Sequence, residues 1–127
     1  MDEIRDVSDE LFQDLLRKEK RFIVLEFWSP GCQVCKEVVP EVAKAHRELG
    51  QDVLFMRVNT DHNNKLVSKY QVTGTPTFIY FCGGAKVGGS IGYVNATVLR
   101  NTVKDLIRHS ASCPMGGHVG YEIDGYG

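Results

Sequence analysis

The sequence carries no excess of charge: it has 15 Lys and Arg, 16 Asp and Glu, and a formal net charge of −1. It also has no conspicuous run of like charges. Because nucleic-acid binding usually requires a basic patch, nucleic acid is not an expected partner. The longest apolar stretch, Phe22–Leu25, is far shorter than the ~20 apolar residues that a membrane-spanning helix needs. We therefore expect neither a nucleic-acid-binding nor a membrane protein.

A secretory leader is not evident either. The N-terminal stretch, MDEIRDVSDELF, is acidic and lacks both an apolar core and a small-residue cleavage site. These features favour a cytoplasmic protein. In a reducing compartment, the 4 cysteines of the chain point to redox chemistry or metal binding rather than to a structural disulfide framework.

The length of 127 residues and the hydrophobic fraction of 43% favour a single domain with an ordinary core. A chain of this size buries roughly two-thirds of its unfolded surface, so disulfides are not required for stability. We expect the domain to span residues 1–109. Residues 110–127 are glycine-rich and lack periodicity, which predicts a flexible or loosely docked tail.

Strand-like and helix-like segments alternate along the domain. The apolar, partly β-branched run Phe22–Trp28 predicts a buried strand. A helical period follows from Cys32 and ends before Gly50. With a strand at Val53–Val58, these segments form a strand–helix–strand unit. The other expected elements are an edge strand at Ile4–Val7, a helix capped by Ser8, a helix at Asn63–Tyr70, strands at Thr77–Cys82 and Ala85–Ser90, and a helix at Asn95–His109.

The chemistry-bearing motif is Cys32-Gln33-Val34-Cys35, placed between a buried strand and a helix. Free N–H groups and the dipole at a helix N-terminus favour a thiolate on the first cysteine. The second cysteine lies one helical turn further on, where it can attack a mixed disulfide formed by the first. Lys36 adds positive charge nearby, unless it is simply a solvated surface residue. A C-x-x-C pair at such a turn indicates a redox motif.

Three segments together resemble the thioredoxin family. They are FIVLEFWSPGCQVCK at residues 22–36, VTGTPTFIYF at residues 72–81 followed by Gly83-Gly84, and the pair Ile91-Gly92 before the last helix. Their order and spacing match the family across residues 4–109. The resemblance implies an α/β fold with a central five-stranded mixed sheet flanked by four helices. It also implies a thiol–disulfide oxidoreductase that reduces protein disulfides and acts as a protein electron carrier.

The resemblance further implies roles for individual residues. Cys32 would attack and Cys35 resolve, while Pro76, after a cis Thr75–Pro76 bond, would shield the thiols. Thr75 would offer its backbone to an extended substrate. Trp28, Gly31, Gly74 and Gly92 would line the substrate face, although turn geometry alone would also explain Gly74 and Gly92, and Trp28 could be an ordinary core residue.

Glu26 is an acid inside an apolar strand, which is costly without a partner or a role. Thioredoxins usually have an aspartate here, which helps to move the proton of the second cysteine. Glu26 could do the same, with its pKa raised by burial and opposed by Arg57 on the next strand. A purely structural Glu26–Arg57 ion pair is the alternative.

The sequence departs from the family at the active-site turn. Gly31 replaces the usual tryptophan, and Gln33-Val34 replace glycine-proline. The first change removes apolar surface from the substrate face. The second changes the start of the helix and the balance between dithiol and disulfide, so the chain could lean toward isomerase activity.

The remaining chemistry-bearing residues have weaker signals. We expect Cys82 to be a passive thiol, and Cys113 to be either inert, a third redox thiol that exchanges with Cys32, or half of an incomplete metal pair with His118. We expect His46, His62 and His109 to be structural or solvated.

No cofactor or metal is expected, because no G-x-G-x-x-G fingerprint occurs and regeneration would fall to a separate thioredoxin reductase. Disulfide-containing proteins would be the substrates, and the resemblance leans toward a monomer. Two other classes remain open. One is a metal- or cluster-binding module using Cys32 and Cys35 with Cys82 or Cys113. The other is a redox-inert domain that binds peptides in the same groove.

Overall fold

The computed structural model describes residues 4–110 and residue 113. In this part of the chain, five strands form one sheet in the order β1-β3-β2-β4-β5. Strands β1, β3 and β2 run parallel, whereas β4 is antiparallel to both β2 and β5. The predicted mixed sheet with four flanking helices is confirmed. The strands are β1 (Arg5–Asp6), β2 (Phe22–Trp28), β3 (Val53–Asn59), β4 (Thr77–Cys82) and β5 (Ala85–Ile91); the helices are α1 (Asp9–Lys18), α2 (Gln33–Leu49), α3 (Asn64–Lys69) and α4 (Ala96–His109), with a short 3-10 turn at Gly50–Asp52.

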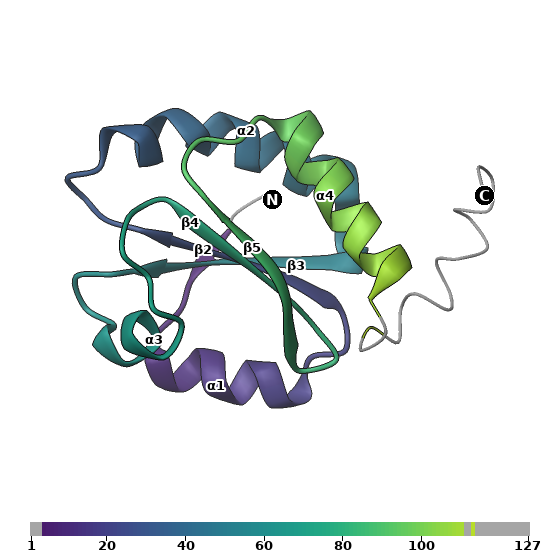
Figure 1. Ribbon diagram of the computed structural model, residues 1–127, viewed down its shortest axis with the longest axis horizontal. Helices are drawn as coiled ribbons and strands as arrows, with labels where there is room; N and C mark the ends of the chain where they lie inside the picture. Colours follow the sequence, from purple (N-terminus) through teal and green to yellow (C-terminus); the bar gives the residue numbers. More distant parts are fainter. Residues whose placement is uncertain (1–3, 111–112, 114–127) are drawn as a thin grey trace.

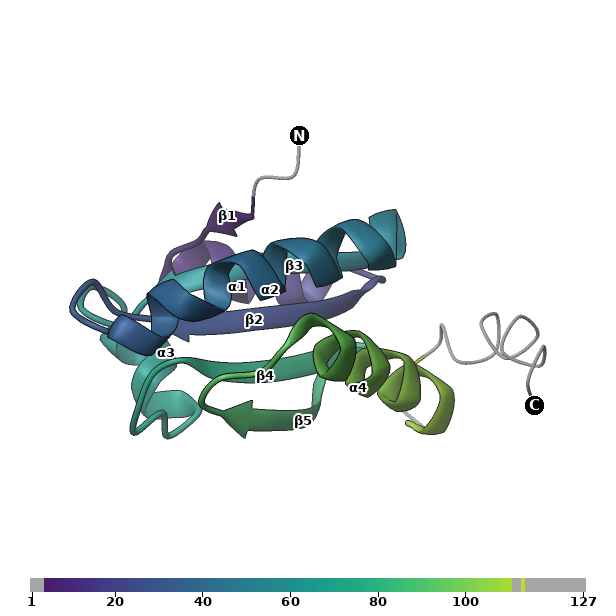
Figure 2. The same cartoon turned by 90° about the horizontal axis from the view of Figure 1, so that it is seen from above.

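Helices cover both faces of the sheet (Figure 1). Helices α2 and α4 lie on one face, and α1 and α3 lie on the other; the view from above in Figure 2 shows α2 and α4 side by side over the strands. The side chains of β2 alternate between the two faces, as a pleated strand requires. Phe22 and Val24 belong to the core under α2 and α4, whereas Ile23, Leu25 and Phe27 belong to the core against α1 and α3. This alternation places Glu26 on the α2 face.

The element boundaries agree with the sequence to within one or two residues. Ser8 caps α1 through its hydroxyl, which accepts a hydrogen bond from the Leu11 N–H at 3.2 Å. Pro40 lies inside α2, and Gly50 ends this helix with a positive φ of 68°. The left-handed backbone at this position favours glycine.

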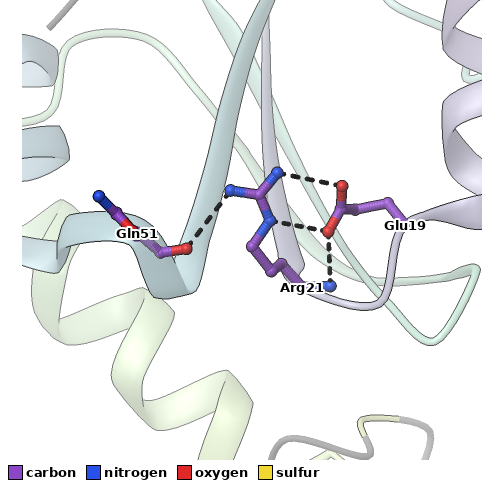
Figure 3. Close-up of polar contacts among 3 residues, drawn as sticks. All are labelled: Glu19, Arg21 and Gln51. Carbon is purple, nitrogen blue, oxygen red and sulfur yellow. Dashed lines mark hydrogen bonds and ion pairs between the residues drawn. The ribbon is translucent and has the colours of Figure 1, made fainter. Parts of the chain in front are cut away.

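Arg21 connects the start of β2 to the turn before β3 (Figure 3). Its guanidinium donates two hydrogen bonds to the carboxylate of Glu19, at 2.7 and 3.1 Å, and a third to the carbonyl oxygen of Gln51 at 3.3 Å. The bidentate pairing lowers the pKa of Glu19, chiefly through the hydrogen bond from Arg21. This contact holds the end of the sheet that lies opposite the N-terminus of α2.

Candidate active site

The two cysteines of the motif lie at the N-terminus of α2, directly after the turn that leaves β2. They are joined as a disulfide, with Cα atoms 5.2 Å apart. Cys32 is the N-cap residue, and its sulfur accepts a hydrogen bond from the Cys35 N–H at 3.0 Å. A helix N-terminus with a free N–H aimed at sulfur stabilises a thiolate at Cys32.

The two sulfurs differ in their access to solvent. Cys32 is half-buried, whereas Cys35 is 2% exposed. Cys32 is thus the sulfur that an incoming disulfide can reach first. Lys36, which follows Cys35, is an exposed surface residue.

The loop before β4 faces the cysteine pair. The Thr75–Pro76 peptide bond is cis, as the resemblance implied, and the carbonyl oxygen of Thr75 lies 3.4 Å from the Cys32 sulfur. The Thr75 hydroxyl also lies 3.2 Å from the Ser29 hydroxyl, which ties this loop to the active-site turn. Pro76, the next residue, is buried.

Gly92 contacts the cis-proline loop through its backbone. Its N–H donates to the carbonyl oxygen of Pro76 at 2.8 Å, and its φ is +98°, a conformation that L side chains rarely adopt. Gly31 and Gly74 have open space around a hypothetical Cβ and no positive φ. The backbone therefore requires glycine at Gly92 but not at the other two positions.

Glu26 lies in the core beneath α2. It is 2% exposed, and burial raises its pKa to about 7; Arg57 opposes this rise and Asp6 adds to it. The Glu26 Oε1 atom lies 3.8 Å from the Arg57 Nε atom. Among the described residues, its Oε2 atom has no hydrogen-bond partner. The carboxyl group is thus poised to exchange a proton near neutral pH.

A pocket of about 170 Å³ opens beside Glu26. Glu26 and Arg57 supply its polar lining, and α2 covers it with apolar side chains; the remaining lining residues are Ile4, Val39, Val42 and Ala43. The space is large enough to hold water molecules. Water can therefore connect the buried carboxyl group to the surface.

Trp28 is held at the end of β2 by two polar contacts that the sequence did not predict. Its indole N–H donates to the Asp6 carboxylate at 2.8 Å, and the guanidinium carbon of Arg57 lies 4.4 Å from the centre of its ring. Asp6 is also 3.9 Å from Arg57. Asp6 belongs to no motif, and only the pairing of β1 with β3 brings it here.

The prediction that Cys82 is a passive thiol is wrong. Cys82 is joined to Cys113 as a disulfide, with Cα atoms 4.7 Å apart. Cys82 ends β4 and faces α4, at the end of the sheet away from Cys32, so Cys113 is not placed to exchange with Cys32 in the same molecule. The two cysteines are 31 residues apart, one at the end of a strand and the other beyond a helix. No local pattern in the sequence therefore predicts that they pair.

The same pairing bears on the predicted tail and on the metal-binding alternative. Cys113 is buried in the core, whereas the rest of the predicted tail after Ser110, including His118, lies outside the described residues. Cys82 and Cys113 do not join Cys32 and Cys35 in one cluster. Within the described ranges, no group of three or more His, Cys, Asp or Glu is placed to hold a metal ion.

The described residues His46 and His109 make their contacts away from the cysteine pair. His46 packs its ring on Phe55, with ring centres 4.9 Å apart, and His109 lies 3.6 Å from Asp105 on α4. In the described part of the chain, no helix is both long and apolar enough to cross a membrane.

Comparison with known proteins agrees with this geometry. The sequence model of the thioredoxin family matches residues 3–105. Thioredoxin 1 of Synechococcus elongatus is 31% identical over 97 residues, which cover 76% of this chain and 91% of that protein. Thioredoxin of Synechocystis is 30% identical over 101 residues, covering 80% and 94%.

Solved structures show the same fold. The crystal structure of thioredoxin from Trypanosoma brucei brucei superimposes with a TM-score of 0.75 at 33% identity, covering 84% of this chain and 92% of that one. Chloroplastic thioredoxin z gives the same TM-score of 0.75 at 17% identity, covering 82% and 94%, and so supports the fold alone.

A strand-to-helix C-x-x-C pair facing a cis-proline loop defines a thiol–disulfide exchange site. The chain belongs to the thioredoxin family, and it is a protein-disulfide oxidoreductase with a redox-active Cys32–Cys35 pair.

Proposed function

We propose that the chain reduces protein disulfides, with Cys32 as the attacking and Cys35 as the resolving cysteine. The observation that carries this assignment is the difference between the two sulfurs. Cys32 is accessible at the helix N-terminus, and its sulfur accepts a hydrogen bond from the Cys35 N–H at 3.0 Å. Cys35 is buried. The accessible, stabilised thiolate is the better nucleophile toward an external disulfide.

The cycle balances in two exchange steps. The Cys32 thiolate attacks one sulfur of the substrate disulfide, the substrate S–S bond breaks, and the released substrate thiolate takes a proton. Cys35 then loses its proton and attacks the Cys32 sulfur, which releases the second substrate thiolate. The substrate has gained two electrons, and Cys32–Cys35 has become the disulfide.

Glu26 is the proposed acceptor of the Cys35 proton, directly or through water. Three features support this role: the face of β2 that places Glu26 under the helix carrying Cys35, a pKa of about 7, and the pocket beside it. A general base is most effective when its pKa lies near the working pH. The 3.8 Å contact with Arg57 also fits a purely structural pair, so the role needs a kinetic test.

The substrate chain is proposed to lie along the Thr75–Pro76 loop and past Gly92. The Thr75 backbone is beside Cys32, and the open space at Gly92 leaves room for another main chain. Pro76 would shield the thiols, and Trp28, Gly31 and Gly74 would complete the substrate face. Because Gly31 presents no side chain where the family has a tryptophan, partner choice would differ from that of a general thioredoxin.

Regeneration of the dithiol is assigned to a separate thioredoxin reductase, since the redox-active group of this family is the disulfide itself. Disulfide-containing proteins are the proposed substrates, and a cytoplasmic monomer is the proposed working form.

Trapping of the mixed disulfide tests the order of attack. The Cys35→Ser variant should accumulate a covalent adduct with a disulfide substrate such as insulin, through Cys32, because the resolving sulfur is missing. The Cys32→Ser variant should form at least tenfold less adduct, because its remaining sulfur is buried. Peptide mass spectrometry identifies the linked cysteine. More adduct through Cys35 in the Cys32→Ser variant than through Cys32 in the Cys35→Ser variant would reverse the assignment.

A further inference from the structure

Cys82 and Cys113 meet in a way that no local sequence pattern explains. Their Cα atoms are 4.7 Å apart, within the range of about 4.4–6.8 Å that a disulfide spans without backbone movement. Cys82 is the last residue of β4, and Cys113 follows the end of α4. The pair therefore links the sheet to the segment that leaves the last helix.

Both sulfurs lie inside the core. Cys82 is 1% exposed and Cys113 is 5% exposed, and both belong to the cluster that packs under α2 and α4. The Cys113 N–H donates a hydrogen bond to the Ser110 carbonyl oxygen at 3.2 Å. Thiol–disulfide exchange requires access to a sulfur, and this pair offers little.

The pair is remote from the active site. Thr77 of β4 pairs with Phe27 near the cysteine motif, whereas Phe81 pairs with Ile23 at the other end of β2. The five residue-to-residue steps from Thr77 to Cys82 span roughly 17 Å of strand. In Figure 1, the C-terminal end of α4 and the β4–β5 turn lie at one end of the sheet and the N-terminal end of α2 at the other. Exchange between the two pairs within one molecule is therefore excluded.

We propose that Cys82–Cys113 is a structural disulfide that stays closed while Cys32–Cys35 opens and closes. The chain then holds two cysteine pairs with separate redox roles. The second pair anchors the end of α4, and α4 in turn is tied to the active-site helix. The Glu41 carboxylate of α2 accepts the Ala96 N–H at 2.8 Å, and Glu48 lies 3.1 Å from Arg100.

Formation of this disulfide needs a disulfide-class oxidant, such as oxidised glutathione. While the end of α4 is undocked, the Cys113 thiolate attacks one glutathione sulfur, and one reduced glutathione leaves with a proton. The Cys82 thiolate then attacks the Cys113 sulfur, and the second reduced glutathione leaves. Two protein thiols have lost two electrons, and one glutathione disulfide has gained them.

Thermodynamic linkage explains why the pair should resist reduction. The folded chain holds the two sulfurs together and buries them, so folding stabilises the disulfide by as much as the disulfide stabilises the fold. Closing a loop of 31 residues restricts the unfolded chain substantially. Cys32–Cys35 joins residues only 3 apart and has an accessible sulfur, so it lacks both sources of protection.

Graded reduction of the wild-type protein tests this separation directly. Samples equilibrated with increasing dithiothreitol are alkylated, denatured, alkylated with a second reagent and analysed by peptide mass spectrometry. We expect Cys82 and Cys113 to open only at ten times or more the dithiothreitol that opens Cys32 and Cys35. Opening of both pairs at the same concentration, or free Cys82 and Cys113 thiols in unreduced protein, would overturn the proposal.

A second experiment isolates the structural pair. In the Cys32→Ser/Cys35→Ser protein, strong reductant should lower Tm by roughly 10–15 °C. It reduces the remaining Cys82–Cys113 disulfide and so releases the loop that this disulfide closes. Adding Cys113→Ala should lower Tm by a similar amount and remove the dependence on reductant. A Tm that reductant does not change in the first protein would contradict the proposal.

Activity separates a structural role from a catalytic one. With Cys32 and Cys35 intact, Cys113→Ala should reduce insulin within twofold of the wild-type rate at a temperature at which both proteins are folded. A larger loss with the fold retained would mean that Cys113 takes part in the reaction, and would also overturn the proposal.

Discussion

The Arg57 guanidinium lies 3.8 Å from the Glu26 carboxylate, yet burial outweighs its attraction and the pKa of Glu26 is raised to about 7. Asp6, which lies 3.9 Å from Arg57, adds to this rise. A carboxyl group with a high pKa in the folded state binds its proton more tightly there than in the unfolded chain. The raised pKa of Glu26 therefore contributes to the pH dependence of stability, and it also bears on the proposed proton transfer.

Glu26→Gln should flatten the pH dependence of stability. Between pH 4.5, the ordinary value for Glu, and pH 7, the folded protein holds a proton that the unfolded chain has lost, so stability falls as pH rises. The rise in pKa corresponds to about 3 kcal/mol. Urea unfolding at pH 5 and pH 8 measures the change. Between these pH values, the free energy of unfolding should fall by about 3 kcal/mol less in the variant than in the wild type.

Glu10→Gln is the matched control, because Glu10 is an exposed acid on α1 and should keep the wild-type profile. Parallel profiles for the wild type and Glu26→Gln would show that Glu26 is already ionised in the folded protein at pH 5.

The pKa of Glu26 should move in opposite directions when its two charged neighbours are removed. Arg57→Gln removes the opposing cation and should raise this pKa, whereas Asp6→Asn removes a like charge and should lower it. Asn at position 6 can still accept the Trp28 indole N–H, so that contact is retained. A carboxyl NMR titration of the reduced protein measures each value.

The half-exposed Asp14 on α1 provides the control, since Asp14→Asn should leave the pKa of Glu26 unchanged. Shifts of the same sign in the Arg57 and Asp6 variants would show that repacking, rather than charge, governs Glu26.

Gly92→Ala should lower the free energy of unfolding more than Gly74→Ala does. A Cβ at either position meets open space, but only Gly92 has a positive φ, so alanine there costs about 1–2 kcal/mol in the free energy of unfolding. If the substrate chain passes Gly92, the rate of insulin reduction should also fall at a temperature at which the variant is fully folded. Equal stabilities for the two variants would show that the φ of Gly92 carries no such cost.

The proton-transfer role of Glu26 predicts a kinetic change distinct from the loss of an ion pair. Glu26→Gln should slow release of the mixed disulfide by Cys35 about 10²-fold, the usual scale of general base catalysis, with little effect on the attack by Cys32. Rapid-quench measurement of both steps separates them. If Arg57→Gln slows release as much as Glu26→Gln does, the pair is structural and Glu26 is not the base.

Most of the fold could be predicted because its signals are local. The strand at Phe22–Trp28 and the turn into the helix at Cys32–Cys35 can each be recognised from a few consecutive residues. The structure confirms both. The buried position of Glu26 and its pairing with Arg57 also followed, since the two residues face each other on neighbouring strands.

The features that sequence reasoning missed depend on distant segments. Asp6 reaches Trp28 only because a two-residue strand pairs with β3. Cys82 and Cys113 meet only after β4 and α4 have packed together, so neither residue carries a pattern that names its partner. The substrate-lining roles of Trp28, Gly31, Gly74, Thr75 and Gly92 all stay predictions. Of the three glycines, only Gly92 has a backbone conformation that requires glycine.

The reduction potential of the Cys32–Cys35 pair tests the central claim most directly. Equilibration with glutathione or dithiothreitol buffers, followed by alkylation and mass spectrometry, measures it, and Cys35→Ser is the control that cannot close the pair. We expect a reversible two-electron couple at this pair, and a potential near the thioredoxin reference of about −270 mV would mean a disulfide reductase despite Gly31, Gln33 and Val34. A value tens of millivolts higher would indicate an isomerase- or oxidant-like role, and the absence of a reversible couple would contradict the account.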